Sequence, residues 1–270
     1  MLVRPMKVIC IGAHPDDCEI GFGGVAHKLV SLGHRIKFVS VTNGAAGHYA
    51  YSPSKMTQVR RLEAEESARQ LGITATEVLT NQDAALQPTL QVRWEIVRQI
   101  RGWEADMVVT HRPWDYHPDH RYTSQVVQDS SYLVQVPAVC PETPPLRSNP
   151  IFLYLEDSFH QPLPFTADVA VDIDDVWDIK IRALEAHFSQ FYDWLPWIDG
   201  EEGDVPQDPA ARRCWLSSKW TRPIAPSTQA RLSMRYGADR AARVRHAEAF
   251  QLCEYGRRAT QAELDGMFPR

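Results

Sequence analysis

The order of apolar and helical segments over roughly the first 190 residues limits the fold more than any other feature of the chain. Parallel strands need a crossover connection, usually a helix, so alternating strands and helices predict a mainly parallel sheet with helices on both faces. The predicted strands are 7–12, 35–41, 77–80 and 106–110, and the predicted helices are 24–32, 56–71, 90–103 and 119–136.

The pattern changes in the second half of the chain. Strands are predicted at 151–155 and 167–171, and an amphipathic helix at 174–191. Tryptophans at 194, 197, 215 and 220 are then interleaved with proline, glycine and acidic residues. We therefore predict an α/β, Rossmann-like three-layer domain at 1–195 and a C-terminal extension at 196–270 that packs on it.

Charge and cysteine content exclude several classes of protein. The net charge is −5 and there is no long basic run, which argues against a nucleic-acid partner. Five cysteines, an odd number without a Cys-x-x-Cys pair, argue against a disulfide framework and favour a reducing, cytoplasmic setting. No apolar stretch is long enough for a membrane span, so none is expected.

Two short motifs combine histidine with carboxylates directly after predicted strands. His14-Pro15-Asp16-Asp17 follows strand 7–12, and His117-Pro118-Asp119-His120 comes shortly after strand 106–110. Ligands of open α/β sheets bind at the carboxyl ends of the strands. We therefore expect the two motifs to face each other, although they are far apart in the sequence.

These residue types suit one hydrolytic metal ion. Zinc in such sites takes three His or carboxylate ligands and leaves a position for water, whose pKa falls to about 7. Each motif alone is also typical of a turn followed by a helix cap, but two of them at strand ends favour a metal site. The six candidate groups, enough for ligands, a base, an acid and an orienting residue, are His14, Asp16, Asp17, His117, Asp119 and His120.

The motifs resemble those of the LmbE/PIG-L family of zinc-dependent deacetylases. The resemblance depends on Gly12-Ala13-His14-Pro15-Asp16-Asp17 and on Tyr116-His117-Pro118-Asp119-His120-Arg121. Supporting elements are Thr42-Asn43-Gly44, Arg60-Arg61-x-Glu63 and His246-Ala247-Glu248-Ala249-Phe250. One departure is Cys18, which separates Asp17 from Glu19, whereas many relatives have Glu directly after the second Asp.

The resemblance implies a role for each matching residue. His14, Asp17 and His120 match the zinc ligands, and Asp16 matches the general base that deprotonates water. His117 matches the residue that protonates the leaving amine or stabilises the oxyanion. Asp119 matches a residue that holds a histidine in place. The substrates implied are N-acetylglucosamine conjugates and related amino sugars.

Four further residues are weaker candidates. Tyr116 and Arg112 flank the second motif and are expected either to stabilise the oxyanion or only to pack. Asp83 is expected to bind a sugar hydroxyl or to cap a loop. Arg60 is expected to contact the substrate or to form a surface ion pair.

Alternative functions remain open at this point. The same metal site would serve a zinc amidase of a thiol-sugar conjugate or another small amide. A non-catalytic nucleotide-binding module is disfavoured, because Gly21-x-Gly23-Gly24 is not the Gly-x-Gly-x-x-Gly turn such modules need after the first strand. Assembly into a homo-oligomer, a trimer or a hexamer, is a further hypothesis.

Overall fold

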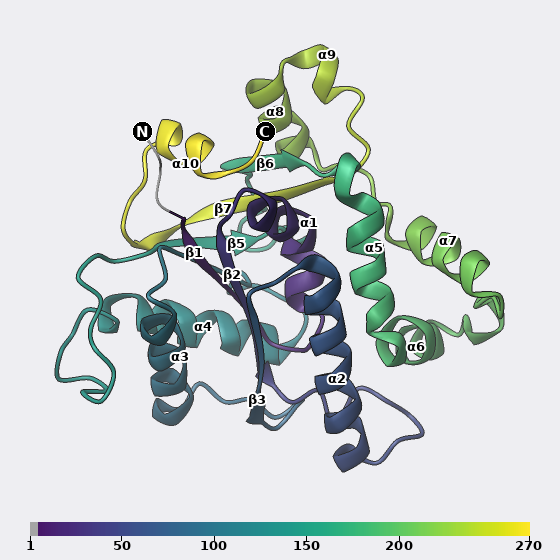
Figure 1. Cartoon of the computed structure of the whole chain (residues 1–270), viewed down its shortest axis with the longest axis horizontal. Helices are drawn as coiled ribbons and strands as arrows, with labels where there is room; N and C mark the ends of the chain where they lie inside the picture. The colour runs from purple at the N-terminus through teal and green to yellow at the C-terminus, as the bar shows by residue number, and fades with distance from the viewer. Residues whose placement is uncertain (1–4) are drawn as a thin grey trace.

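A seven-stranded sheet runs through the centre of the computed structural model, which describes residues 5–270 (Figure 1). The strand order is β3-β2-β1-β4-β5-β7-β6, and of these strands β7 runs antiparallel to its two neighbours. Residues 1–4 of the predicted domain 1–195 lie outside the described part. The strands are β1 (Lys7–Gly12), β2 (Arg35–Thr42), β3 (Ala75–Asn81), β4 (Met107–Thr110), β5 (Ile151–Leu155), β6 (Val169–Asp172) and β7 (Ala247–Gly256).

Helices connect and flank the strands. The α-helices are α1 (Asp17–Ser31), α2 (Pro53–Leu71), α3 (Leu90–Trp103), α4 (Pro118–Leu133), α5 (Trp177–Ala186), α6 (Leu195–Asp199), α7 (Pro209–Trp220), α8 (Pro226–Tyr236), α9 (Ala238–Ala241) and α10 (Gln261–Met267). Two 3-10 turns, η1 (Asp174–Val176) and η3 (Glu202–Asp204), and one π-helical segment, η2 (Ser189–Trp194), complete the set. Within residues 5–270, no helix is both long and apolar enough to cross a membrane.

The sheet is covered on both faces, because alternate side chains of a strand point in opposite directions. Val8 and Cys10 of β1 pack in the cluster formed with α1, α2 and α5, whereas Ile9 and Ile11 pack in the cluster formed with α3 and α4. These two helical layers lie on opposite sides of the strands in Figure 1. The predicted three-layer α/β fold is confirmed.

The chain reverses its direction of sheet growth between β1 and β4. It adds β2 and β3 on one side of β1 and then returns to place β4 on the other side. Ile11 of β1 is thus in register with both Val39 of β2 and Thr110 of β4. The connections leaving β1 and β4 diverge at this point and leave a crevice at the carboxyl ends of the strands, the usual ligand position in such sheets.

Two predicted helices differ from the observed ones. The expected helix 24–32 is the second half of α1, which begins at Asp17. Its glycines lower helix propensity, but tertiary packing requires them: a Cβ on Gly21 would lie 2.8 Å from Leu155 Cδ2, and one on Gly24 would lie 3.0 Å from Ile173 Cδ1. The expected helix 174–191 is interrupted after Ala186, where the π-helical segment η2 follows.

Strand β7 was not predicted from the sequence. It lies between β5 and β6, so the sheet contains a segment of the predicted extension 196–270. The division at 195/196 remains a prediction about how the chain is organised. The segment contains Glu248, Gln251 and Glu254 and lacks the continuous apolar run of a buried strand. The tertiary structure explains the presence of Glu248.

Glu248 is buried and fastens β7 to α1 and α5. Its carboxylate accepts hydrogen bonds from the backbone N–H groups of Gly24 (2.8 Å) and Val25 (2.7 Å), inside α1. Lys180 of α5 donates to the same carboxylate at 2.6 Å and to the carbonyl of Ile20, also at 2.6 Å. A buried ion pair of this kind is costly to break, because the remaining charge loses its partner without regaining water.

We expect Glu248→Ala to lower the free energy of unfolding by about 3–5 kcal/mol, since it strands the Lys180 ammonium and two helix N–H groups. Urea denaturation followed by circular dichroism measures this. Glu248→Gln keeps one acceptor and should lose less. The matched control is Glu254→Ala on the exposed part of the same strand, expected within about 0.5 kcal/mol of the parent. Equal losses for both alanine variants would contradict the role of Glu248.

Candidate active site

The carboxyl ends of β1, β3 and β4 open into a pocket of about 510 Å³. Both motifs follow strands at this edge, one after β1 and the other after β4. Asp83 comes from the loop after β3, and Arg60 comes from α2. The predicted site residues that line it are His14, Asp16, Asp17, Arg60, Asp83, Arg112, Tyr116, His117 and His120. Asp119 is 1% exposed and lies behind His14.

The turn after β1 is shaped by close backbone contacts. A Cβ on Gly12 would lie 2.6 Å from the Cβ of Asp17, so only glycine lets α1 begin this close to the strand. Asp17 Oδ2 accepts a hydrogen bond from the backbone N–H of His14 at 2.7 Å. Asp16 has a φ of 146°, a strained conformation for a residue with a side chain. The turn therefore holds three functional side chains within four residues.

Candidate ligand atoms of His14, His120 and Asp17, with both oxygens of the Asp17 carboxylate taking part, lie at distances that suit a tetrahedral metal ion. His14 Nδ1 is 3.1 Å from His120 Nε2 and 3.5 Å from Asp17 Oδ2, and His120 Nε2 is 3.4 Å from Asp17 Oδ1. Ligands about 2.1 Å from a tetrahedral zinc ion are about 3.4 Å apart. Among residues 5–270, three groups of side chains could hold a metal ion: His14 with His117 and His120, Asp17 with His111 and His120, and His14 with Asp83 and Asp119. The three predicted ligands are thus divided between groups that share His14 or His120.

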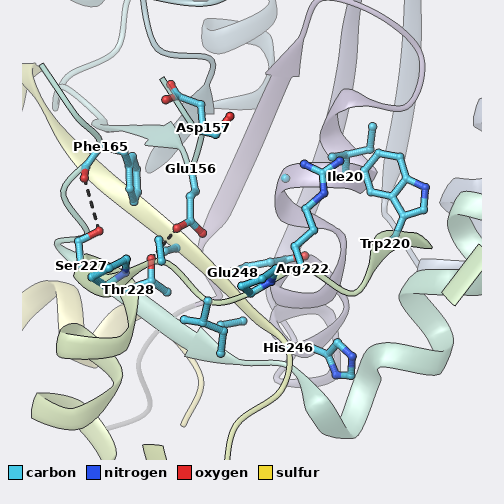
Figure 2. A pocket seen from close by; sticks show the side chains of 18 of the residues that line it. Ile20, Glu156, Asp157, Phe165, Trp220, Arg222, Ser227, Thr228, His246 and Glu248 are labelled. Atoms are coloured by element: carbon cyan, nitrogen blue, oxygen red, sulfur yellow. Dashed lines mark hydrogen bonds between the residues drawn. The ribbon is translucent and has the colours of Figure 1, made fainter. Parts of the chain in front are cut away.

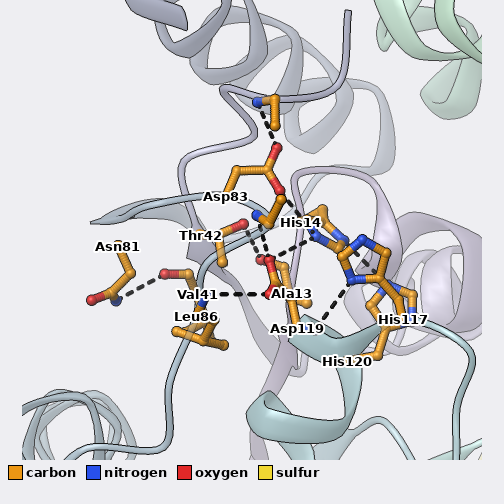
Figure 3. A network of polar contacts seen from close by, with 12 residues as sticks. Ala13, His14, Val41, Thr42, Asn81, Asp83, Leu86, His117, Asp119 and His120 are labelled. Atoms are coloured by element: carbon orange, nitrogen blue, oxygen red, sulfur yellow. Dashed lines mark hydrogen bonds and ion pairs between the residues drawn. The ribbon is translucent and has the colours of Figure 1, made fainter.

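The other nitrogen of each histidine faces a carboxylate. His14 Nε2 is 3.3 Å from Asp83 Oδ1 and 3.4 Å from Asp119 Oδ2 (Figure 3). His120 Nδ1 is 3.0 Å from Asp115 Oδ1. Carboxylates in these positions would hold the proton on the outer nitrogen of each ring when the inner nitrogen binds a metal ion.

The carboxylates create a negative potential that favours a cation. Burial lowers the pKa of His14, but hydrogen bonds to Asp119, Asp17 and Asp83 outweigh it and hold the pKa well above its ordinary value. Burial would raise the pKa of Asp17, but His120 and His111 hold it well below its ordinary value. A field that stabilises a proton on His14 also stabilises a metal ion in its place.

Asp16 lies beside this cluster and is held by a buried arginine. Arg60 of α2 is 2% exposed, so the surface location predicted for its ion pair is wrong, although its Nη1 does lie 3.8 Å from Oε2 of nearby Glu63. Its guanidinium donates to the carbonyl of Pro15, and its Nη2 lies 3.1 Å from Asp16 Oδ2. Burial raises the pKa of Asp16, and Arg60 partly offsets that rise. The raised pKa means that Asp16 binds a proton more readily than an ordinary aspartate, which suits a general base.

His117 caps the N-terminus of α4. Its Nδ1 accepts a hydrogen bond from the backbone N–H of Asp119 at 3.1 Å, so the proton of the neutral ring is on Nε2. Burial lowers the pKa of His117 below 6.5, and His14 and His120 lower it further. Both observations favour a neutral ring at pH 7 that offers one N–H donor. Its ring centroid is 4.6 Å from that of His14.

The two residues that flank the second motif differ in their surroundings. Arg112 is buried, with Nη1 donating to Asp157 Oδ1 at 2.9 Å and Nη2 donating to the carbonyl of Leu163 at 2.7 Å. Tyr116 is 73% exposed at the mouth of the pocket, with its ring centroid 5.6 Å from that of His120. Cys18 points away from the site, donating toward the carbonyl of Cys10 in the core.

Sequence reasoning missed three residues near the site. His111 Nε2 lies 3.1 Å from Asp17 Oδ2, and Asp115 faces His120. Both precede the second motif in the connection after β4, so their place after a buried strand was an available signal. His187 is fully buried behind the pocket, 3.4 Å from Glu19 Oε1. It comes from the interruption between α5 and η2, which the sequence pattern did not reveal.

The fold and this cluster define a class: an α/β protein with a candidate His–carboxylate metal site at the switch point of its sheet. Residues 9–131 match the family PIG-L, described as GlcNAc-PI de-N-acetylase. A diacetylchitobiose deacetylase from Thermococcus kodakarensis is 33% identical over 202 residues, which are 71% of this chain and 74% of that protein. The chain belongs to the PIG-L (LmbE-like) family.

Solved structures support the same fold. The N,N'-diacetylchitobiose deacetylase from Pyrococcus horikoshii has a TM-score of 0.68 and 29% identity, covering 93% of this chain and 84% of that one. The 4-carboxy-2-hydroxymuconate hydratase from Pseudomonas putida has a TM-score of 0.71 and 19% identity, covering 94% of this chain and 98% of that one. At that identity the hydratase shows the fold alone.

We expect purified protein to hold close to one equivalent of divalent metal, and His14→Ala or His120→Ala to lose most of it, since each removes one of three ligands. Elemental analysis by mass spectrometry measures the metal. His160→Ala, at an exposed histidine outside the three ligand groups, is the matched control and should keep it. Full metal in both ligand variants would refute the ligand assignment.

Proposed function

We propose that this protein is a zinc-dependent hydrolase that removes the N-acetyl group from an N-acetylglucosamine-type amino sugar or its conjugate. The observation that carries the proposal is that candidate ligand atoms of His14, His120 and Asp17 lie 3.1–3.5 Å from one another, with a buried carboxylate, Asp16, beside them. Membership of the PIG-L family and the similarity to diacetylchitobiose deacetylases support the same chemistry.

His14, Asp17 and His120 are the proposed zinc ligands. When bound, zinc polarises a carbonyl group and lowers the pKa of water to about 7. Two histidines and one carboxylate are a usual donor set for catalytic zinc, because they leave a position for water and substrate. Asp83, Asp119 and Asp115 orient the two histidines from behind.

Asp16 is the proposed general base. Its side chain is adjacent to the ligand Asp17, yet Arg60 holds its Oδ2, so the two carboxylates have different partners. Asp16 takes the proton from the attacking water. It then delivers that proton to the leaving amine, because an amide nitrogen cannot depart at neutral pH as an anion.

His117 is proposed to donate its Nε2 hydrogen to the oxyanion formed at the acetyl carbon. The sequence left this role open beside that of proton donor to the amine. A neutral ring whose Nδ1 is occupied by the Asp119 N–H fits a hydrogen-bond donor better than a strong acid. Tyr116 and Arg112 are further candidates for oxyanion contact.

The charge of the pocket favours a neutral sugar over a polyanion. Its lining contains six carboxyl residues and three arginines, and two of those arginines, Arg60 and Arg112, already contact carboxylates. The lining therefore has an excess of negative charge, which a divalent cation would roughly balance. Little positive potential would then remain to bind a polycarboxylate such as the substrate of the hydratase relative. Arg60 and Asp83 are proposed to bind sugar hydroxyls.

Other aspects of the function remain predictions. A cytoplasmic location is predicted because all five cysteines are free thiols, which is typical of a reducing compartment. A homo-oligomer, a trimer or a hexamer, remains a hypothesis. The absence of a nucleic-acid partner is predicted from the net charge of −5 and the lack of a long basic run. An amidase of a thiol-sugar conjugate would use the same metal site.

A panel of N-acetylated amino sugars and small N-acyl amides, assayed for released amine with zinc-loaded protein, tests the reaction. We expect turnover of N-acetylglucosamine derivatives, with Asp16→Asn lowering kcat about 10²–10⁴-fold while keeping its metal. Glu254→Ala is the control for an exposed carboxylate. Hydration of an unsaturated carboxylic acid without amine release would refute the proposal, and loss of metal in Asp16→Asn would exchange the roles of Asp16 and Asp17.

His117→Ala should lower kcat about 10²–10³-fold on an acetamide and on an activated acetate ester alike, because both reactions form the oxyanion. Steady-state kinetics on the two substrates, with metal content measured in parallel, separates the roles. His117→Gln retains an N–H donor and should recover part of the loss. A loss confined to the acetamide would show that His117 protonates the amine instead.

A further inference from the structure

The loop between β2 and α2, residues 43–52, connects the proposed metal site to a group of aromatic rings outside it. Ala46 and Gly47 of this loop line the active-site pocket. The backbone N–H of Ala46 donates to Asp83 Oδ2 at 2.9 Å, and the other oxygen of Asp83 lies 3.3 Å from His14 Nε2. The position of the loop therefore decides whether Asp83 keeps the orientation in which it contacts a proposed ligand.

The buried side chain of His48 holds the outer half of this loop together. It is 3% exposed, and its Nδ1 accepts hydrogen bonds from the backbone N–H groups of Ala50 at 3.0 Å and Tyr51 at 3.3 Å. The ring of Tyr51 stacks on the imidazole with centroids 4.2 Å apart and planes 6° apart. The loop thus turns around His48, and removing the imidazole would leave two backbone donors without their acceptor.

The same imidazole attaches the loop to η2 and α6. Tyr49 stacks on His48 at a centroid distance of 4.8 Å and on Trp197 of α6 at 5.1 Å. Trp197 in turn stacks at 5.3 Å on Trp194 of η2, which lines the active-site pocket. Because Nδ1 is an acceptor, the ring proton of His48 is on Nε2, which faces Asp193 Oδ2 of η2 at 3.6 Å. Aromatic contacts and one acidic neighbour therefore fix the loop against a segment from the second half of the chain.

We propose that His48 is a positioning residue of the metal site. It holds the loop so that the Ala46 N–H keeps its hydrogen bond to Asp83. Asp83 then keeps the imidazole of His14 in the orientation that suits metal binding. This inference rests on the proposed metal site and adds to it a residue that does not line the active-site pocket. The competing account is that His48 only packs the loop, in which case its loss would lower stability and leave metal binding unchanged.

The zinc affinity of the protein without substrate tests this role. We expect His48→Ala to weaken zinc binding about 10-fold, the lower end of the effect of losing a residue behind a metal ligand, because the change acts through Asp83. Competition with a fluorescent zinc chelator measures the affinity. His48→Asn keeps an acceptor for the two loop N–H groups and should recover part of it, whereas His48→Leu fills the space without an acceptor and should not. An unchanged affinity in His48→Ala would overturn the proposal.

His246 provides the matched control, because it is a buried histidine with similar neighbours elsewhere in the fold. Its Nδ1 lies 2.7 Å from Asp174 Oδ1, and its ring stacks on that of Trp177 with centroids 3.9 Å apart. It lines a neighbouring pocket of about 520 Å³ but not the active-site pocket (Figure 2). His246→Ala should lower the free energy of unfolding, as His48→Ala does, and leave the zinc affinity unchanged. Equal losses of zinc affinity in the two variants would show that the effect follows from stability alone.

A double-mutant cycle shows whether the effect of His48 passes through Asp83. Substitutions that act along one chain of contacts give non-additive changes. Asp83→Ala by itself should weaken zinc binding, and adding His48→Ala should then weaken it by less than about a further twofold. Losses that multiply in full would mean that His48 does not act through Asp83, and would overturn the proposal.

These measurements keep the inference separate from the proposed reaction, because zinc affinity is measured without catalysis. Coupling between His48 and Asp83 in a protein that releases no amine from any substrate would leave the positioning role standing and refute the proposed function. A deacetylase whose zinc affinity does not respond to substitution of His48 would refute the positioning role and leave the proposed function standing.

Discussion

The parallel pairing of β1 with β4 is the interaction on which the site depends. It aligns Ile11 with Thr110, so the connections leaving both strands emerge side by side at one edge of the sheet. Two histidines more than a hundred residues apart thereby bring ring nitrogens to 3.1 Å of each other. A register slip of one residue would turn the side chains of a strand to the opposite face and separate the groups.

The electrostatic balance of the site follows from that convergence. Carboxylates from three connections surround His14 and His120, and the pKa of each histidine is raised against the effect of burial. Arg60 and Arg112 bring fixed positive charge to the pocket through direct contacts with Asp16 and Asp157. Concentrated negative charge in a buried position is unfavourable without a cation, and a metal ion at the candidate site would provide one.

The C-terminal part of the chain contributes to the site from outside the motif-bearing connections. Glu248 anchors β7 to the backbone of α1, the helix that begins at Asp17. Trp220, the last residue of α7, and Arg222 line the pocket at the candidate site. Two separate C-terminal segments therefore contribute, one by anchoring the helix next to the candidate ligands and the other by lining the pocket.

The sequence by itself determined the α/β class, the family and the positions of the two motifs, because strand–helix alternation and short motifs are local patterns. Helix 90–103 was predicted with its observed bounds for the same reason. Only the tertiary structure decided that Arg60 is buried against Asp16, that Asp115 and His111 face the candidate ligands, and that β7 completes the sheet. Those features depend on which distant segments pack together, since contacts across the fold leave no periodic trace in the chain.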